Sequence, residues 1–197
     1  MEQSFNSKYT KEFLSSISKI DLFKLDNAVK ILKKVQKERG RLFILGVGGS
    51  AGNASHAVND FRKLCSIESY CPTDNISEIT ARTNDEGFEN IFIQYLKLSK
   101  LNSKDSILVL SVGGGNIKKK VSVNLISAIK YAKKTKSKII SIVGKKDGFA
   151  AKNSDCSIII NTDHCPEFVT PISETAQVFV WHLLVTHPSL KTNKTKW

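Results

Sequence analysis

Two residues that could bind a metal ion stand four positions apart in the first third of the chain. His56 and Asp60 lie within residues 50–64, a segment of helical composition. Residues four apart share one face of a helix, so the imidazole and the carboxylate can reach the same divalent ion. The simpler alternative is a surface carboxylate beside a core histidine. The pair therefore marks a candidate metal site on the helix 50–64.

A glycine-rich turn immediately precedes this helix. The apolar run at 42–45 predicts a buried strand, and Gly46, Gly48 and Gly49 follow it before Ser50. Glycines let the backbone turn sharply and approach a ligand, and the unpaired N–H groups at a helix start favour an anion. For a single glycine-rich turn, the alternative is that it only reverses the chain direction and binds no ligand.

A second glycine-rich turn follows a later apolar run. Residues 106–111 predict another strand, which ends at Ser111 and leads into Gly113, Gly114, Gly115 and Asn116. In an open parallel sheet, ligands bind outside the carboxyl ends of the strands, where the strand order reverses. Two glycine turns at that edge therefore favour an anionic ligand more strongly than one.

The elements that must position these residues alternate along the chain. We expect strands at 42–45, 66–71, 106–111, 138–143 and 156–160. We expect helices at 50–64, 121–134 and 172–186. Between residues 72 and 100 we expect a loop or a short helix, and then a helix that follows residues 84–92 and ends at about residue 100. Such alternation implies right-handed crossovers and a parallel sheet covered on both faces. The predicted fold class is α/β, a three-layer sandwich with a five-stranded sheet in the order 2-1-3-4-5, which makes the two glycine turns neighbours.

Two further helices are expected before the first strand, at 7–19 and 22–39, the second capped by Asp21 and stopped at Gly40. The second helix has an apolar stripe that needs a partner. We therefore divide the chain into residues 1–40, helices that pack on the domain or on a neighbouring subunit, and residues 41–197, the sandwich domain.

Composition limits the classes of function. The 197 residues include 30 basic and 18 acidic side chains, a net charge of +12, which suggests an anionic substrate or acidic partner. The lysines are scattered with few aromatic residues among them, so we expect no nucleic acid. The four cysteines form no C-x-x-C pair and are expected to be reduced structural thiols. No apolar run approaches the ~18 residues of a membrane span, and a cytoplasmic protein without membrane contact is expected.

A dinucleotide-binding protein is one alternative, because residues 46–51 also fit the pattern G-x-G-x-x-A. Glu68 or Asp74 would then bind the ribose. That fold offers no role for the second glycine turn, and we rank it below the other possibilities.

Taken together, the motifs resemble the sugar isomerase (SIS) domain family, and within it the phosphoheptose isomerases. The residues that carry the resemblance are Gly46-Val47-Gly48-Gly49-Ser50, His56 with Asp60, Asn84-Asp85-x-Gly87-Phe88 with Phe92, the Ser111 loop, Gly144 with Asp147-Gly148, and His182. The resemblance spans nearly the whole chain, to about residue 187, and implies the SIS fold with flavodoxin-like strand order.

The substrate-binding loops depart from the family pattern. Phosphoheptose isomerases usually carry Asn where Val47 stands, and a hydroxyl-rich loop where residues 111–116 are mostly glycine. Those hydroxyls ordinarily bind the substrate phosphate, and only Ser111 remains. The resemblance therefore implies that a lysine of 118–120 helps to bind the substrate phosphate. The other substrate-binding residues that it implies are Gly48, Gly49, Ser50, Asn84, Asp85, Ser111, Gly113, Gly114, Gly115 and Asn116.

The family's metal and catalytic set is a His and a Glu four residues apart, then a Gln and a His eight apart. Carried over, these become His56, Asp60, Glu174 and His182, holding one zinc ion. A register one residue off would instead place Ser173 and Trp181 there. Eight residues of helix rise ~12 Å, so either the helix begins after Glu174 or Glu174 and His182 serve sites built by different subunits.

The resemblance implies interconversion of sedoheptulose 7-phosphate and D-glycero-D-manno-heptose 7-phosphate, in heptose and surface polysaccharide biosynthesis. Asp60 or Glu174 would act as base and His182 as acid. A SIS module that binds a phosphosugar without converting it is the alternative that the altered Ser111 loop favours. SIS relatives commonly form tetramers with sites at subunit boundaries, so a homotetramer is expected.

Overall fold

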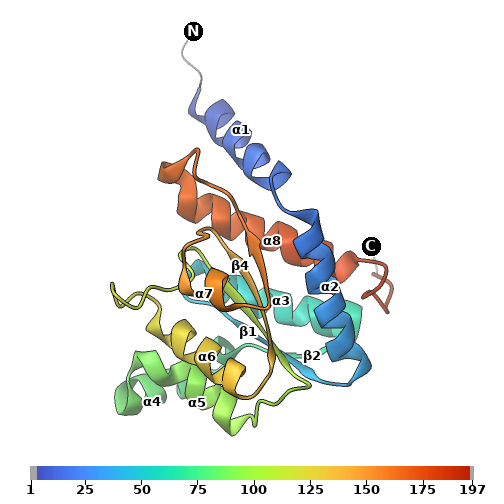
Figure 1. Cartoon of the computed structure of the whole chain (residues 1–197), viewed down its shortest axis with the longest axis vertical. Helices are drawn as coiled ribbons and strands as arrows, with labels where there is room; N and C mark the ends of the chain where they lie inside the picture. Colours follow the sequence, from blue (N-terminus) through green and yellow to red (C-terminus); the bar gives the residue numbers. More distant parts are fainter. Residues whose placement is uncertain (1–3, 196–197) are drawn as a thin grey trace.

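The computed structural model describes residues 4–195 and contains one five-stranded, entirely parallel sheet (Figure 1). Its strands are β1 (Arg41–Leu45), β2 (Glu68–Tyr70), β3 (Ser106–Ser111), β4 (Lys138–Val143) and β5 (Cys156–Ile159). The order is β2-β1-β3-β4-β5, as predicted. Because β1 and β3 pair directly, the two glycine turns leave neighbouring strands at the same edge of the sheet.

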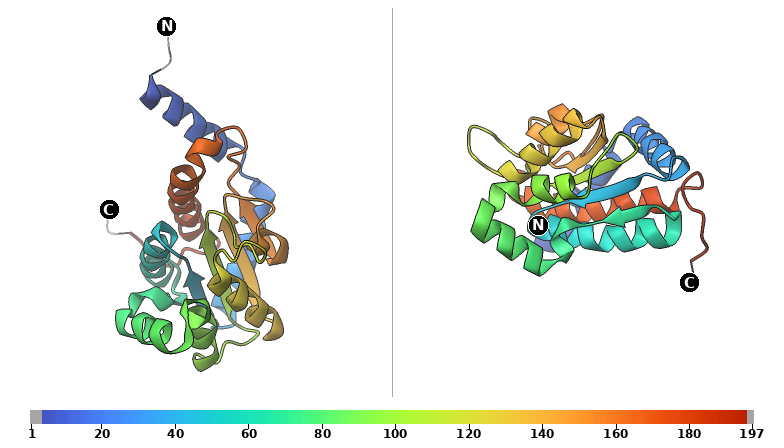
Figure 2. Two further views of the ribbon diagram at one scale, coloured as in Figure 1. Left: turned by 90° about the vertical axis from the view of Figure 1, so that its left-hand side faces the viewer. Right: turned by 90° about the horizontal axis from the view of Figure 1, so that it is seen from below.

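Helices cover both faces of the sheet, which lies between them (Figure 2). One face packs on α2 (Leu22–Lys37), α3 (Gly49–Cys65) and α8 (Val169–Thr186), and the other on α5 (Ile91–Leu98), α6 (Val123–Lys134) and α7 (Phe149–Asn153). Alternate strand residues point to opposite faces: Leu42 and Ile44 join the first core, and Phe43 and Leu45 the second. The three-layer α/β sandwich is confirmed.

The apolar stripe of α2 is covered by its own chain. Asp21 caps the helix by accepting from the Phe23 and Lys24 amides, and Leu25, Val29 and Leu32 are buried in the core beneath the sheet. This stripe therefore requires no second subunit. The preceding helix, α1 (Phe5–Ser18), extends beyond the sheet beside the start of α8 (Figure 1).

Residues 72–90, for which the sequence predicts a loop or a short helix, contain more helix than that. They form a short helical turn at Pro72–Asp74, then α4 (Ile76–Glu86) and the turn η2 (Phe88–Asn90). Asn75 caps α4 by accepting from the Glu78 amide, and Arg82 pairs with Glu78 and Glu86 along its surface. Gly87, at φ +85°, ends the helix, because few other residues adopt that conformation.

All four cysteines are free and buried, as expected of reduced thiols. Burial raises the pKa of Cys65 to about 11. Among residues 4–195, no helix has both the length and the apolar character needed to cross a bilayer.

Candidate functional site

His56, Asp60 and His182 form a cluster where α3 and α8 pack side by side. The Oδ2 atom of Asp60 lies 3.3 Å from His182 Nε2 and 3.6 Å from His56 Nε2. Both imidazoles are about half exposed, whereas the carboxylate is 13% exposed. The i, i+4 spacing on α3 thus places the first pair as predicted, and α8 adds His182 to the same point.

Two further residues fix the Asp60 carboxylate. Trp181, which is completely buried, donates its indole N–H to Oδ2 at 3.2 Å, and the Asn59 amide donates to Oδ1 at 3.1 Å. Every oxygen of the carboxylate therefore has a donor within the protein. Neither residue was assigned a role from the sequence, because the contact of Trp181 depends on how α8 is rotated against α3.

Glu174 does not join the cluster. The helix α8 is continuous from Val169 to Thr186, so the alternative in which the helix begins after Glu174 is wrong. The Glu174 carboxylate lies instead against Gly49 at the start of α3, so close that a Cβ on Gly49 would clash with it. Asn53 donates to the Glu174 carbonyl at 2.9 Å and fixes α8 against this turn.

Glu174 and His182 face a common surface hollow of about 480 Å³. Phe13 of α1 and Phe179 of α8 also line it. Among the described residues, no hydrogen bond or ion pair engages the Glu174 carboxylate. The hollow therefore offers a substrate an imidazole and an unpaired carboxylate, next to the first glycine turn.

The second glycine turn is closed on itself. The Ser111 hydroxyl accepts from the Gly114 amide at 3.0 Å. The carbonyls of Gly114 and Gly115 accept from Ala150 and Phe149 at the start of α7. Of the three glycines in this turn, only Gly113 has open space where a side chain would lie. Helix α7, which was not predicted, thus supports the turn from behind.

The other predicted substrate residues lie elsewhere. Asn84 and Asp85 are exposed at the end of α4, where the Asn84 amide donates to the Asp85 carboxylate at 2.7 Å. Ser50 is buried in the first turn of α3. The structure does not bring Asn84 and Asp85 into the histidine cluster.

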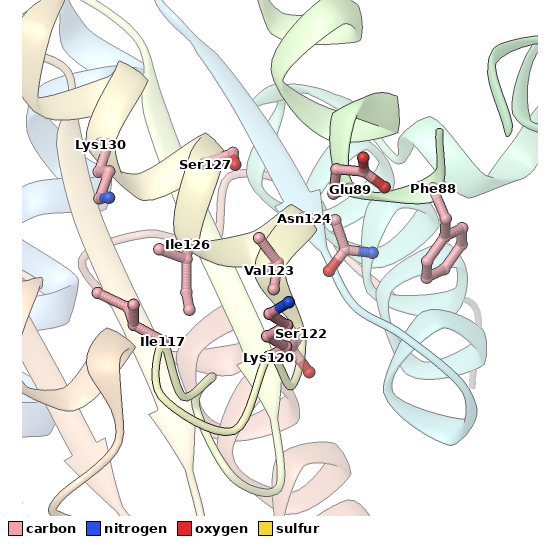
Figure 3. A pocket seen from close by; sticks show the side chains of 10 residues that line it. All are labelled: Phe88, Glu89, Ile117, Lys120, Ser122, Val123, Asn124, Ile126, Ser127 and Lys130. Carbon is pink, nitrogen blue, oxygen red and sulfur yellow. The ribbon is translucent and has the colours of Figure 1, made fainter. Parts of the chain in front are cut away.

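A cavity of about 550 Å³ lies between η2 and the start of α6 (Figure 3). Phe88 lines one side, and Lys120, Ser122 and Asn124 the other. The Asn124 side chain is 1% exposed and its Nδ2 has no hydrogen-bond partner within residues 4–195. Lys120 and Ser122 have φ of +52° and +49°, conformations that are strained for such residues.

From the sequence, Lys120 was a candidate only as one of the three lysines 118–120, and neither Ser122 nor Asn124 was a candidate. A serine just before a helix was an available signal, because serine often precedes a helix start. Residues 116–121 form a six-residue loop that is closed by the pairing of Asn116 with Val121. This loop separates Ser122 and Asn124 from the glycine turn in the sequence.

The donor set of the cluster fits a zinc ion. Two imidazole nitrogens and a carboxylate oxygen lie within 4.8 Å of one another, and zinc accepts three such protein ligands with a fourth position open. The structure brings together His56, Asp60 and His182 but not Glu174, the fourth ligand expected from the sequence.

Comparison with known proteins gives one family. The SIS domain model matches residues 7–144. The lincomycin biosynthesis protein LmbN of Streptomyces lincolnensis is 32% identical over 152 residues, which are 74% of this chain and 54% of that protein, so the chain spans about half its length. The phosphoheptose isomerase of Syntrophotalea carbinolica is 28% identical over 183 residues, 89% of this chain and 87% of the relative.

Solved structures show the same fold. The phosphoheptose isomerase of Neisseria gonorrhoeae has a TM-score of 0.75, with 92% of this chain and 98% of that chain covered at 22% identity.

Proposed function

Because the chain belongs to the SIS domain family, we propose that it is a phosphosugar aldose–ketose isomerase whose proton transfers are carried by Asp60 and His182. The observation that carries the proposal is the 3.3 Å distance between Asp60 Oδ2 and His182 Nε2. The two carbons of an isomerising sugar are one bond apart, so the base and the acid must be neighbours.

The proposed substrate is sedoheptulose 7-phosphate, and the product D-glycero-D-manno-heptose 7-phosphate. Relatives named as phosphoheptose isomerases that align with most of the chain support this choice. The excess of basic residues, 30 against 18 acidic, is consistent with a phosphorylated substrate.

In the proposed reaction, Asp60 removes a proton from C1 of the ketose, and an enediolate with its negative charge on O1 forms as the hydroxyl proton moves from O1 to O2. His182, as imidazolium, then donates a proton to C2. The proton on Asp60 returns to His182 across their 3.3 Å separation, which restores both groups. Trp181 and Asn59 hold the carboxylate in position through both steps.

A zinc ion held by His56, Asp60 and His182 is the alternative account of this cluster, because an imidazole that binds the ion cannot also be the imidazolium that donates a proton to C2. The ion would supply a positive charge that polarises the substrate oxygens. Chelator should then lower turnover, and elemental analysis should show an ion that His56→Ala removes. An active protein that contains no metal would exclude zinc from the proposal.

We place the phosphate at the second glycine turn, rather than equally between the two turns. A carboxylate already lies at the first turn, where Glu174 contacts Gly49. Like charges disfavour a phosphate there, whereas Gly113 leaves open space and Lys120 lies close along the chain. Glu174, which lines the hollow, is then left to contact sugar hydroxyls, whereas Ser50 is buried.

We further propose that the protein is a homotetramer with sites shared between subunits. The position of Glu174 outside the cluster supports sharing, and exposed Phe5, Leu14 and Phe179 on α1 and α8 offer an apolar contact surface. Light scattering tests the assembly. Mixing Glu174→Ala with His56→Ala subunits tests sharing, because shared sites should regain activity.

The function is tested by incubating the protein with sedoheptulose 7-phosphate and following the aldose product. Wild-type protein should convert it, and Asp60→Asn should lower turnover by about a thousandfold. Asp163→Asn, which changes an exposed carboxylate paired with Lys146, is the matched control and should keep full activity. Binding of the ketose phosphate without conversion would favour a non-catalytic phosphosugar-binding module.

A further inference from the structure

A second group of metal-ligating side chains lies outside the proposed active site. Glu12 of α1, His164 and Cys165 present a carboxylate oxygen, an imidazole nitrogen and a thiol sulfur within 4.8 Å of one another. His164 Nε2 lies 3.1 Å from Glu12 Oε2. The group joins α1 to the segment before the helical turn η3 (Pro166–Phe168), about 150 residues later in the chain.

The cysteine distinguishes this group from an ordinary ion pair. Cys165 is 1% exposed, so its sulfur faces the protein interior beside the pair. The Ser16 hydroxyl on α1 is completely buried, approaches the Cys165 thiol, and has no other partner in the described chain. A buried, under-satisfied hydroxyl is costly unless something polar occupies the site with it.

The three donors match the preferences of one metal. Thiolate, imidazole and carboxylate are the ligands of zinc, at about 2.0 to 2.3 Å. Tetrahedral geometry then separates neighbouring ligand atoms by roughly 3.3 to 3.8 Å. Donor atoms no more than 4.8 Å apart lie within about 1 to 1.5 Å of that spacing.

We propose that Glu12, His164 and Cys165 bind a zinc ion that fastens α1 to the body of the protein, with the fourth position of the ion open to solvent or the Ser16 hydroxyl. Because cysteine binds zinc as a thiolate, the ion displaces the Cys165 thiol proton when it binds.

The proposed ion would also fix one wall of the active-site hollow. Ser16 is the single fully buried residue of α1, and Tyr9, Phe13 and Ile17 pack on the core while only partly buried. Phe13, one residue along from Glu12, lines the hollow with Glu174 and His182. Losing the ion should therefore loosen α1 and that wall together.

Cobalt spectroscopy tests the site, because a thiolate bound to Co²⁺ gives a charge-transfer band in the near ultraviolet. The His56, Asp60 and His182 group contains no sulfur and cannot produce it. Chelator-treated wild-type protein titrated with Co²⁺ should show the band. Cys165→Ser should abolish it and lower the bound cobalt by about one equivalent per chain.

Cys156→Ser is the matched control, since Cys156 is also free and buried but belongs to no such group, and it should keep the band. Glu12→Gln and His164→Gln should each weaken Co²⁺ binding at the sulfur site by about tenfold or more, and they decide the question if Cys165→Ser does not fold. A wild-type protein without the band, a band that survives Cys165→Ser, or unchanged affinity in both other variants would overturn the proposal.

Discussion

The two glycine turns look alike in sequence but differ in what the rest of the chain brings to them. The turn after β1 leads directly into α3, and α8 places the Glu174 carboxylate against Gly49. The turn after β3 has no carboxylate against its glycines; Ser111 and α7 close it, and three lysines follow. A glycine turn thus permits close approach of a ligand, while the facing element decides which charge is accepted.

The sequence predicted an anionic ligand at both turns, and this difference separates their proposed roles. The first turn belongs with the histidine cluster, because α3 carries Gly49, His56 and Asp60 on one helix. The second turn is our proposed site for the phosphate. Four substitutions test this division of roles.

The largest effect is expected from Gly113→Asp, which places a carboxylate in the second turn. Because there is open space at Gly113, the new side chain leaves the backbone unchanged. Repulsion between its carboxylate and a phosphate about 4 Å away costs several kcal/mol at an effective dielectric of 20. Affinity for the sugar phosphate, measured by calorimetry, should fall at least about a hundredfold. Gly113→Ala is the neutral control, and equal losses in both variants would show that bulk, not charge, is responsible.

Ser111→Ala should have a smaller effect at the same turn. It removes the acceptor of the 3.0 Å bond from the Gly114 amide, a contribution of about 1 kcal/mol. We expect KM to rise about fivefold with little change in kcat, as measured by steady-state kinetics. A fall in kcat with unchanged KM would place Ser111 in the chemistry instead.

Glu174→Gln tests the first turn and, unlike the two substitutions above, should strengthen the binding of phosphate. The substitution removes the charge but keeps the size of the side chain against Gly49. Affinity for inorganic phosphate should rise by about threefold, because the remaining positive end of α3 then attracts the anion. Affinity that does not change would mean that no phosphate comes near this turn.

Gly49→Ala should give the smallest effect. Its Cβ meets only the end of the flexible Glu174 side chain, which can rotate away. We expect turnover to fall by about twofold while the thermal midpoint barely changes. A large loss of stability would show that Glu174 is held rigidly at the turn.

The architecture was predictable because its signals are local. Apolar runs ending in glycine placed β1 and β3, and strand–helix alternation predicted the parallel order, which the structure confirms. The segment 76–86 could be predicted only as a loop or a short helix, because its stability comes from the Asn75 cap and the Arg82 ion pairs, with no buried residue to give a periodic pattern.

The candidate site was predictable only in part. His56 and Asp60 follow from helical spacing within α3, but the indole bond from Trp181 to Asp60 depends on the rotation of α8 against α3. The same rotation carries Glu174 to Gly49 and away from the cluster. No spacing rule within one helix contains that information.

The central claim, proton transfer by Asp60 and His182, is tested most directly by isomerisation in deuterated water. Wild-type protein and sedoheptulose 7-phosphate should give aldose that carries deuterium at C2, as observed by NMR early in the reaction, because both groups exchange protons with solvent. Asp60→Asn should give almost no product. Aldose formed without any deuterium, or formed equally fast by Asp60→Asn, would contradict the account.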